Sequence, residues 1–161
     1  MGKLRLFLLA IIGVLSSNPA FSETASSTAS VQIHLPMQVN QLQELNFGKV
    51  FVPNSGSHLV VVRRNGQYNA NTQGTIGSFQ QNARFRIFGT PNAVVNYTVI
   101  STNSTIPGVD FDRLLIPASQ TIGSNGRRAV NVGGRIFVHS NAVPGVYTSG
   151  ELSYTFMAEY E

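Results

Sequence analysis

The sequence predicts an all-β fold, an antiparallel sandwich of about eight to ten short strands. Two long segments alternate between apolar and polar side chains, as strands with one buried face do. The turn-forming pairs Asn65-Gly66 and Asn125-Gly126 separate shorter apolar runs. No window keeps a helical period, and no repeat of fixed length occurs. The short, evenly spaced strands favour a sandwich of immunoglobulin-like type.

Residues 1–22 have the pattern of a secretory signal peptide. Lys3 and Arg5 lie at its start, an apolar run ends at Leu15, and small residues lead up to Ser22. We expect cleavage after Ser22 and export to the periplasm, the cell surface or the medium. The apolar run is too short to cross the ~30 Å hydrocarbon core comfortably, so we expect no stable membrane insertion.

The mature chain, residues 23–161, is expected to form a single pilin-like β-sandwich domain, with residues 23–30 as a flexible N-terminus. Without Lys3 and Arg5, the excess of basic over acidic residues is too small to indicate nucleic-acid binding. The chain has no cysteine, which excludes disulfides and cysteine metal sites. Its stability must therefore come from sheet packing or from a partner strand.

The first alternating segment runs from Ala29 to Val39. Its apolar positions include Val31, Ile33, Leu35 and Met37. Pro36 lacks an amide hydrogen, which predicts a sheet edge or a bend. Two roles fit the pattern: the segment is the first strand of its own domain, or it adds as a strand to another copy. The short linker to Leu45–Gly48 favours the first role.

The middle of the chain predicts several short strands separated by turns. In the segment that follows the first strand, Phe47 and Val50 are expected to be buried, with Gly48 at a bulge or tight corner. Asp110 and Asp112 are expected in a turn, with too few acidic neighbours for a calcium site. The predicted strands are residues 59–62, 83–87, 94–100, 114–116 and 135–138, with a loop over 101–108 and Gly133-Gly134 before the last of them.

The second alternating segment closes the chain. Its apolar phase comprises Leu152, Tyr154, Phe156, Ala158 and Tyr160. This pattern predicts a strand with one apolar face and one wet face. An aromatic residue next to the C-terminus suggests that this last strand lies deep in the architecture.

The sequence offers little catalytic chemistry. The three histidines, His34, His58 and His139, are far apart, and no G-x-S-x-G nucleophile elbow occurs. We therefore expect no enzyme, no metal site and no cofactor. Arg84 and Arg86 are a candidate patch for acidic glycans, although solvated arginines are ordinary on an outer sheet face.

Several short motifs follow one another along the mature chain: Leu45-Asn46-Phe47-Gly48, Phe85-x-Ile87-x-Gly89, Tyr97, Gly133-Gly134 and Gly145-x-Tyr147-x-x-Gly150. Together they resemble a bacterial secreted family catalogued as domain of unknown function 4402. The resemblance spans nearly the whole mature chain and implies a fimbria-like surface role. The tail, with its penultimate Tyr160, is also similar to subunits assembled by the chaperone–usher route, although those often carry a disulfide and a glycine further from the end.

The leading interpretation is a structural surface subunit, fimbria- or pilus-like, assembled by β-strand addition. Its partners would be copies of itself or related subunits, with a periplasmic chaperone and usher as further candidates. The alternatives are a monomeric secreted module that binds a glycan or a protein, and a small outer-membrane barrel. The candidate assembly residues are Val31, Ile33, Leu35, Met37, Leu152, Tyr154, Phe156 and Tyr160.

Overall fold

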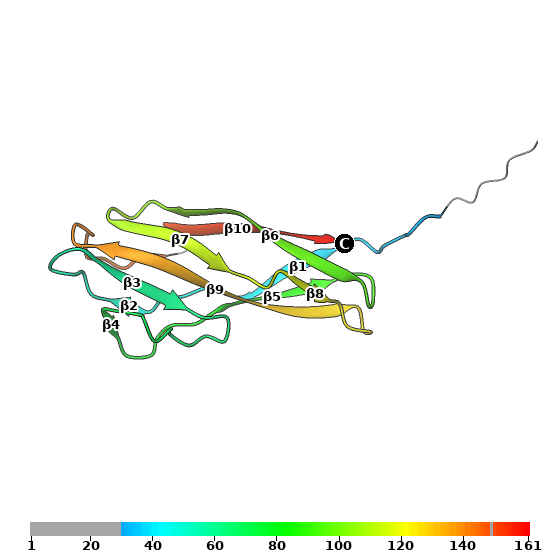
Figure 1. Ribbon diagram of the computed structural model, residues 1–161, viewed down its shortest axis with the longest axis horizontal. Helices are drawn as coiled ribbons and strands as arrows, with labels where there is room; N and C mark the ends of the chain where they lie inside the picture. Colours follow the sequence, from blue (N-terminus) through cyan, green and yellow to red (C-terminus); the bar gives the residue numbers. More distant parts are fainter. Residues whose placement is uncertain (1–29, 149) are drawn as a thin grey trace, which may run out of the picture. The chain divides into compact units, whose positions relative to one another are not determined.

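The structure, a computed structural model, describes residues 30–148 and 150–161. Within these residues the chain forms ten strands, pairs them in antiparallel fashion and contains no helix (Figure 1). The predicted fold class, an all-β antiparallel sandwich, is confirmed. The predicted signal peptide and the predicted flexible N-terminus up to residue 29 lie outside the described residues.

The strands form two larger sheets and one small one. The first sheet has the order β1-β5-β9-β3, and β7 also pairs with β9; the second has the order β10-β6-β8; β2 pairs with β4. The strands are β1 (Gln38–Gln43), β2 (Lys49–Val50), β3 (Ser57–Val62), β4 (Thr75–Ile76), β5 (Ala83–Phe88), β6 (Val94–Ser104), β7 (Val109–Leu115), β8 (Ser119–Thr121), β9 (Arg127–His139) and β10 (Leu152–Tyr160).

The core lies between the two larger sheets. Phe85 on β5 meets Phe156 on β10 edge to face, with ring centroids 4.9 Å apart, and Tyr97 on β6 packs against the same ring. Inward and outward residues alternate along β5, as predicted for a half-buried strand. The largest fully buried side chains are Ile87, Ile122, Val60, Val62, Val95, Val130 and Val132.

The glycine pair Gly133-Gly134 lies inside β9 rather than before a strand, so that prediction is wrong. A Cβ on Gly133 would collide with the Val62 carbonyl oxygen. A Cβ on Gly134 would lie 2.8 Å from the side chains of Leu45 and Phe47. The glycines are therefore explained by close neighbours on both faces of a continuous strand, not by a turn.

Two further boundaries differ from the prediction. The loop expected over residues 101–108 is wrong for its first half, because β6 continues to Ser104, where it pairs with Leu152 of β10. The turn expected at Asp110 and Asp112 is also wrong, since both lie in β7. Their carboxylates form ion pairs with His139 and Arg135 on the neighbouring strand β9.

The predicted strand over residues 29–39 is wrong for residues 30–37, because β1 begins at Gln38. We call residues 31–37 the N-terminal arm; they form no ladder with any described strand. Val31 and Ile33 are each 83% exposed and Leu35 is 58% exposed, whereas Met37 packs partly against the core. The alternation in the arm is therefore not explained by burial within the described domain.

Candidate functional site

The C-terminal strand β10 lies at the edge of its sheet. Its alternation is confirmed: every second residue from Leu152 to Tyr160 is partly buried and packs against the core. None of these side chains is fully buried, because β10 pairs with β6 and with no other described strand. The expectation that the last strand lies deep in the architecture is therefore wrong.

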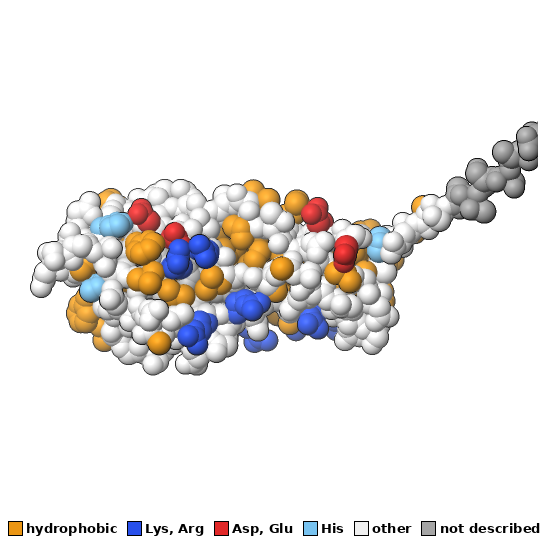
Figure 2. All heavy atoms as spheres, viewed as in Figure 1, with side chains coloured by type: hydrophobic (Ala, Val, Ile, Leu, Met, Phe, Trp, Pro, Cys, Tyr) orange, Lys and Arg blue, Asp and Glu red, His pale blue; other side chains and the backbone are white. Residues whose placement is uncertain are grey.

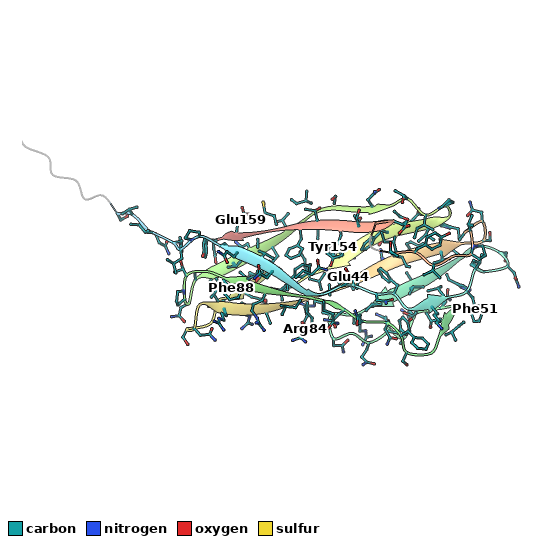
Figure 3. All side chains as sticks on the ribbon, turned by 180° about the vertical axis from the view of Figure 1, so that it is seen from behind. Glu44, Phe51, Arg84, Phe88, Tyr154 and Glu159 are labelled. Atoms are coloured by element: carbon teal, nitrogen blue, oxygen red, sulfur yellow. The ribbon has the colours of Figure 1, made fainter. Side chains whose placement is uncertain are left out.

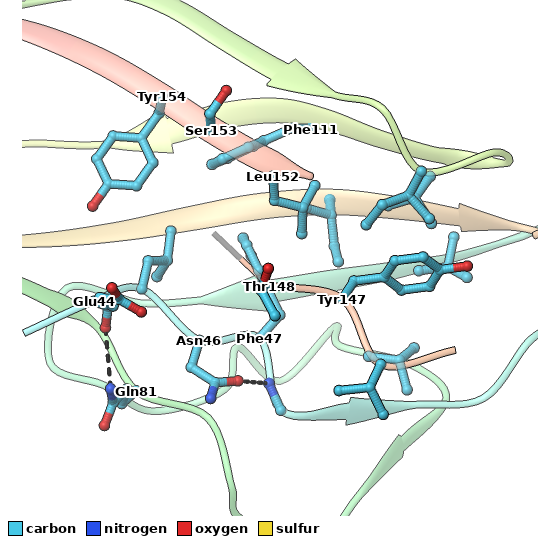
Figure 4. Close-up of a pocket in the computed structure, with 18 of the residues that line it drawn as sticks. Glu44, Asn46, Phe47, Gln81, Phe111, Tyr147, Thr148, Leu152, Ser153 and Tyr154 are labelled. Carbon is cyan, nitrogen blue, oxygen red and sulfur yellow. Dashed lines mark hydrogen bonds between the residues drawn. The ribbon is translucent and has the colours of Figure 1, made fainter. Parts of the chain in front are cut away.

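A groove of about 940 Å³ lies between β10 and β1. We call it the β10–β1 groove. Val39 and Gln41 of β1 line one side, and residues 152–156 of β10 line the other. Its floor is the apolar core, formed by Phe85, Phe111, Ile136 and Val138. Figure 4 shows Phe111 near Tyr154, against which its ring packs edge to face. The groove therefore opens the centre of the sandwich toward solvent.

The two strands that flank the groove are the end strands of their sheets. β1 pairs only with β5, and β10 pairs only with β6, among the described strands. An edge strand carries a row of unpaired N–H and C=O groups that can pair with another extended segment. Apolar walls and two free backbone edges are together the features that accept an added strand.

A buried hydroxyl faces the groove. The Tyr154 Oη is buried and has no hydrogen-bond partner among the described residues. Burial, and to a lesser extent the nearby Glu44 carboxylate, raises the pKa of Tyr154 to about 12. Both side chains lie between β10 and the chain that leaves β1 (Figure 3). A buried polar atom without a partner costs free energy, so this hydroxyl favours an occupant that can accept a hydrogen bond from it.

The loop before β10 forms one wall of the groove. The Tyr147 hydroxyl donates to the Val143 carbonyl oxygen at 2.6 Å, which closes the loop on itself. The Glu151 carboxylate accepts hydrogen bonds from the Thr148 backbone N–H and hydroxyl, at 2.8 and 2.9 Å. These bonds hold the pKa of Glu151 below its ordinary value. Val146, at the tip, is 96% exposed.

Tyr160 joins the base of the arm to the end of β10. Its hydroxyl donates to the Leu35 carbonyl oxygen and accepts from the Thr90 backbone N–H, both at 2.8 Å. Its ring stacks on His34, with centroids 4.3 Å apart. A Cβ on Gly89 would collide with the same hydroxyl. The penultimate tyrosine therefore fixes where the arm leaves the domain.

The predicted assembly residues separate into three groups. Leu152, Tyr154 and Phe156 line the groove, and Tyr160 holds the arm instead. Val31, Ile33, Leu35 and Met37 do not line the groove of their own chain. The predicted ligand patch, Arg84 and Arg86, lies exposed on the outer face of β5.

The groove residues outside β10 were missed by sequence reasoning. Val39 is the last residue of the alternating run over residues 29–39, and Gln41 follows that run. In the sequence, the apolar residues Val143 and Val146 on either side of Pro144-Gly145 were a signal for the loop wall. Both side chains are exposed in the structure.

Comparison with protein families gives one match. Residues 37–160 match the family described as Domain of unknown function (DUF4402). The chain belongs to this family. The DUF4402 match begins at Met37, next to β1, and ends on Tyr160, so it covers all ten described strands and the groove. Residues 31–36 of the arm precede the DUF4402 region.

Two other comparisons gave no match. Neither the search of curated proteins nor the search of solved structures found a protein similar to this DUF4402 chain. Within residues 30–148 and 150–161, no helix is long and apolar enough to span a membrane.

Proposed function

We propose that this protein is an exported structural subunit that joins to other copies of itself, or to related subunits, by β-strand addition. In this proposal the arm of one copy enters the β10–β1 groove of the next. Export through a signal peptide, a fimbria-like surface location and a periplasmic chaperone and usher belong to the same proposal. The observation that carries it is the presence, on one chain, of an open apolar groove and an exposed alternating segment.

The groove and the arm are complementary in chemistry. The groove has an apolar floor, and every second residue of the arm from Val31 is apolar. In a strand these side chains point to one face, so they can enter the groove together. The arm backbone would pair with the free edges of β1 and β10 and could satisfy the Tyr154 hydroxyl.

The absence of cysteine allows a direct test by disulfide trapping. Purified Ile33→Cys protein is mixed with purified Tyr154→Cys protein under mild oxidation. Arm exchange predicts a covalent heterodimer, because the arm that carries the first cysteine enters the groove that Tyr154 lines. Ile33→Cys mixed with Arg84→Cys is the matched control, since Arg84 lies on the outer sheet face (Figure 3). Equal yields of the two heterodimers would contradict the proposal.

A second test uses charge in the arm. Val31 and Ile33 are exposed, so Val31→Asp/Ile33→Asp should leave the domain folded and abolish fibres seen by electron microscopy. Ile100→Asp, on an exposed residue of β6, is the control for a charge placed at an exposed apolar site. Fibres of normal length from the double variant would show that the arm does not join the subunits.

A further inference from the structure

Charged side chains are segregated along the chain. All basic residues except Lys3 and Arg5 lie between Leu45 and Gly150, and all of these except Lys49 are arginines. The same span holds no acidic residue other than Asp110 and Asp112, both paired with β9 side chains. In Figure 2 most of the visible basic side chains lie in the lower half of the view, one basic group lies higher, beside an acidic side chain, and the acidic side chains lie in the upper half.

Three arginines share the outer face of the first sheet. The register pairs Arg84 with Asn131, Arg86 with Ala129 and Phe88 with Arg127. Directly opposed residues of an antiparallel pair lie on the same face. The Arg127 guanidinium lies over the Phe88 ring, 5.5 Å from its centroid. Figure 3 shows Arg84 on the side of β5 that faces away from β10, whereas Glu159 lies on β10 itself.

Two more arginines extend this face. Gly133 has the same outward phase on β9 as Arg127, and a Cβ there would meet the backbone of Arg63 and Arg64. The turn after β3 therefore crosses the outer face of β9. We call Arg63, Arg64, Arg84, Arg86 and Arg127 the arginine face. Arg135 has the same outward phase on β9 but is not counted, because its guanidinium is paired with Asp112.

The arginine face has no internal charge compensation. Among the described residues, the ion pairs are Arg135–Asp112 and His139–Asp110, and neither includes a member of the face. Neighbouring like charges on a sheet repel one another. A planar guanidinium binds phosphate, sulfate or carboxylate through two parallel hydrogen bonds, which a lysine cannot do. Five uncompensated guanidinium groups on one face therefore favour a ligand with repeated anionic groups.

We propose that the arginine face binds an anionic polysaccharide. Amide side chains alternate with the guanidinium groups: Gln38 and Asn40 lie opposite Phe88 and Arg86 on the outer phase of β1. Such amides can hydrogen-bond sugar hydroxyls. A nucleic acid fits less well, because protein surfaces that bind nucleic acid are much more positively charged than this chain, whose formal net charge is only +4 even with Lys3 and Arg5 included.

This site is independent of strand addition. Val39 and Gln41 of β1 face the β10–β1 groove, whereas Gln38 and Asn40 have the opposite phase. The face therefore stays accessible when the groove is filled. Along a chain of copies it would recur once per subunit, and repeated weak contacts to one polymer add up to strong retention.

The test measures binding of the mature chain to immobilised dextran sulfate, with neutral dextran as the reference surface. Arg84→Gln/Arg86→Gln should weaken binding about tenfold, the size expected when two exposed charge-assisted hydrogen bonds are lost. Lys49→Gln/Arg128→Gln removes the same charge outside the face and should weaken binding much less. Arg127→Gln, on a different strand, should weaken it in the same direction as the first variant.

Two outcomes would overturn the proposal. Equal losses in the two charge-matched double variants would mean that only net charge matters. Tighter binding to a DNA duplex than to dextran sulfate, lost in Arg84→Gln/Arg86→Gln, would assign the face to nucleic acid.

Binding to dextran sulfate should also fall steeply as salt rises from about 50 to about 200 mM, because exposed charges are screened.

Discussion

The strands β9 and β10 differ in how many neighbours they have. Among the described strands, β9 pairs with β5 along its first half and with β3 and β7 along its second half, whereas β10 pairs with β6 alone. Val130 and Val132 on β9 are completely buried. No side chain of β10 is completely buried, although the alternation along β10 is just as regular. The alternation of side chains along a strand thus identifies its inward face, and the number of partner strands decides how completely the side chains on that face are buried.

The largest expected difference in unfolding free energy is between a substitution on β5, which pairs with strands on both sides, and one on the edge strand β10. Ile87, on β5 between β1 and β9, is completely buried, so Ile87→Ala should cost about 2–5 kcal/mol of unfolding free energy. Leu152→Ala on β10 should cost clearly less, because its side chain borders the open groove. Urea unfolding of the two variants measures both. Equal losses would mean that the groove is closed in solution.

The glycines provide the second contrast. Gly133→Ala places a methyl group against backbone atoms of residues 62–64 and should cost about 1–3 kcal/mol, since the backbone must shift. Gly150→Ala, before β10, meets nothing within 4 Å and should change stability by less than about 0.5 kcal/mol. Thermal unfolding compares them. A large loss at Gly150 would show that the start of β10 is packed more tightly than described.

A smaller effect concerns the C-terminal end of β10, where Tyr160 contacts the arm. Tyr160→Phe removes the hydroxyl that bonds Leu35 and Thr90, and should cost about 1–2 kcal/mol. Faster amide exchange at Leu35 and Thr90, measured by hydrogen–deuterium exchange, should accompany it. Tyr154→Phe is the control: the Tyr154 hydroxyl has no hydrogen-bond partner in the described part of the chain, so stability should not fall. Unchanged exchange at Leu35 in Tyr160→Phe would contradict the role given to Tyr160.

The smallest effect is a pH dependence of the groove wall. The hydrogen bonds from Thr148 hold the pKa of the Glu151 carboxyl below its ordinary value. Because the pKa is lower in the folded state, the ionised carboxylate stabilises the loop at pH values above the ordinary pKa of a glutamate. This contribution is lost as the pH falls through the folded-state pKa. The Thr148 amide resonance in ¹H–¹⁵N spectra should therefore titrate below pH 4.5. In Glu151→Gln that titration should disappear.

Local patterns predicted much of the fold. The alternation of β5 and β10, the strand over residues 59–62, buried Phe47 and the tight corner at Gly48, where φ is +77°, all follow from neighbouring residues. Side-chain period and glycine conformation are properties of a few consecutive residues, so a sequence window contains the information.

The misses have a common physical cause. β6 reaches Ser104 because Leu152 pairs there, and β9 passes through its glycines because the chain near residues 45–47 and 62–64 lies against them. Such neighbours are set by long-range pairing, which a window cannot show. The groove was missed for the same reason, since it exists where two strands have no partner. Only its β10 side was recognised as a candidate.

The position of Tyr160 has a consequence for symmetry. The arm leaves the domain beside Tyr160, at the C-terminal end of β10, whereas the groove lies along Leu152–Phe156, nearer the other end. Under the proposed assembly, donor and acceptor are different surfaces, so the contact is heterologous, and repeating it without closing a ring gives an open filament. Such a filament has two unlike ends, one with an empty groove and one with a free arm. A copy with an altered arm but an intact groove would cap only one of them, so a trace of Val31→Asp/Ile33→Asp protein should shorten wild-type fibres.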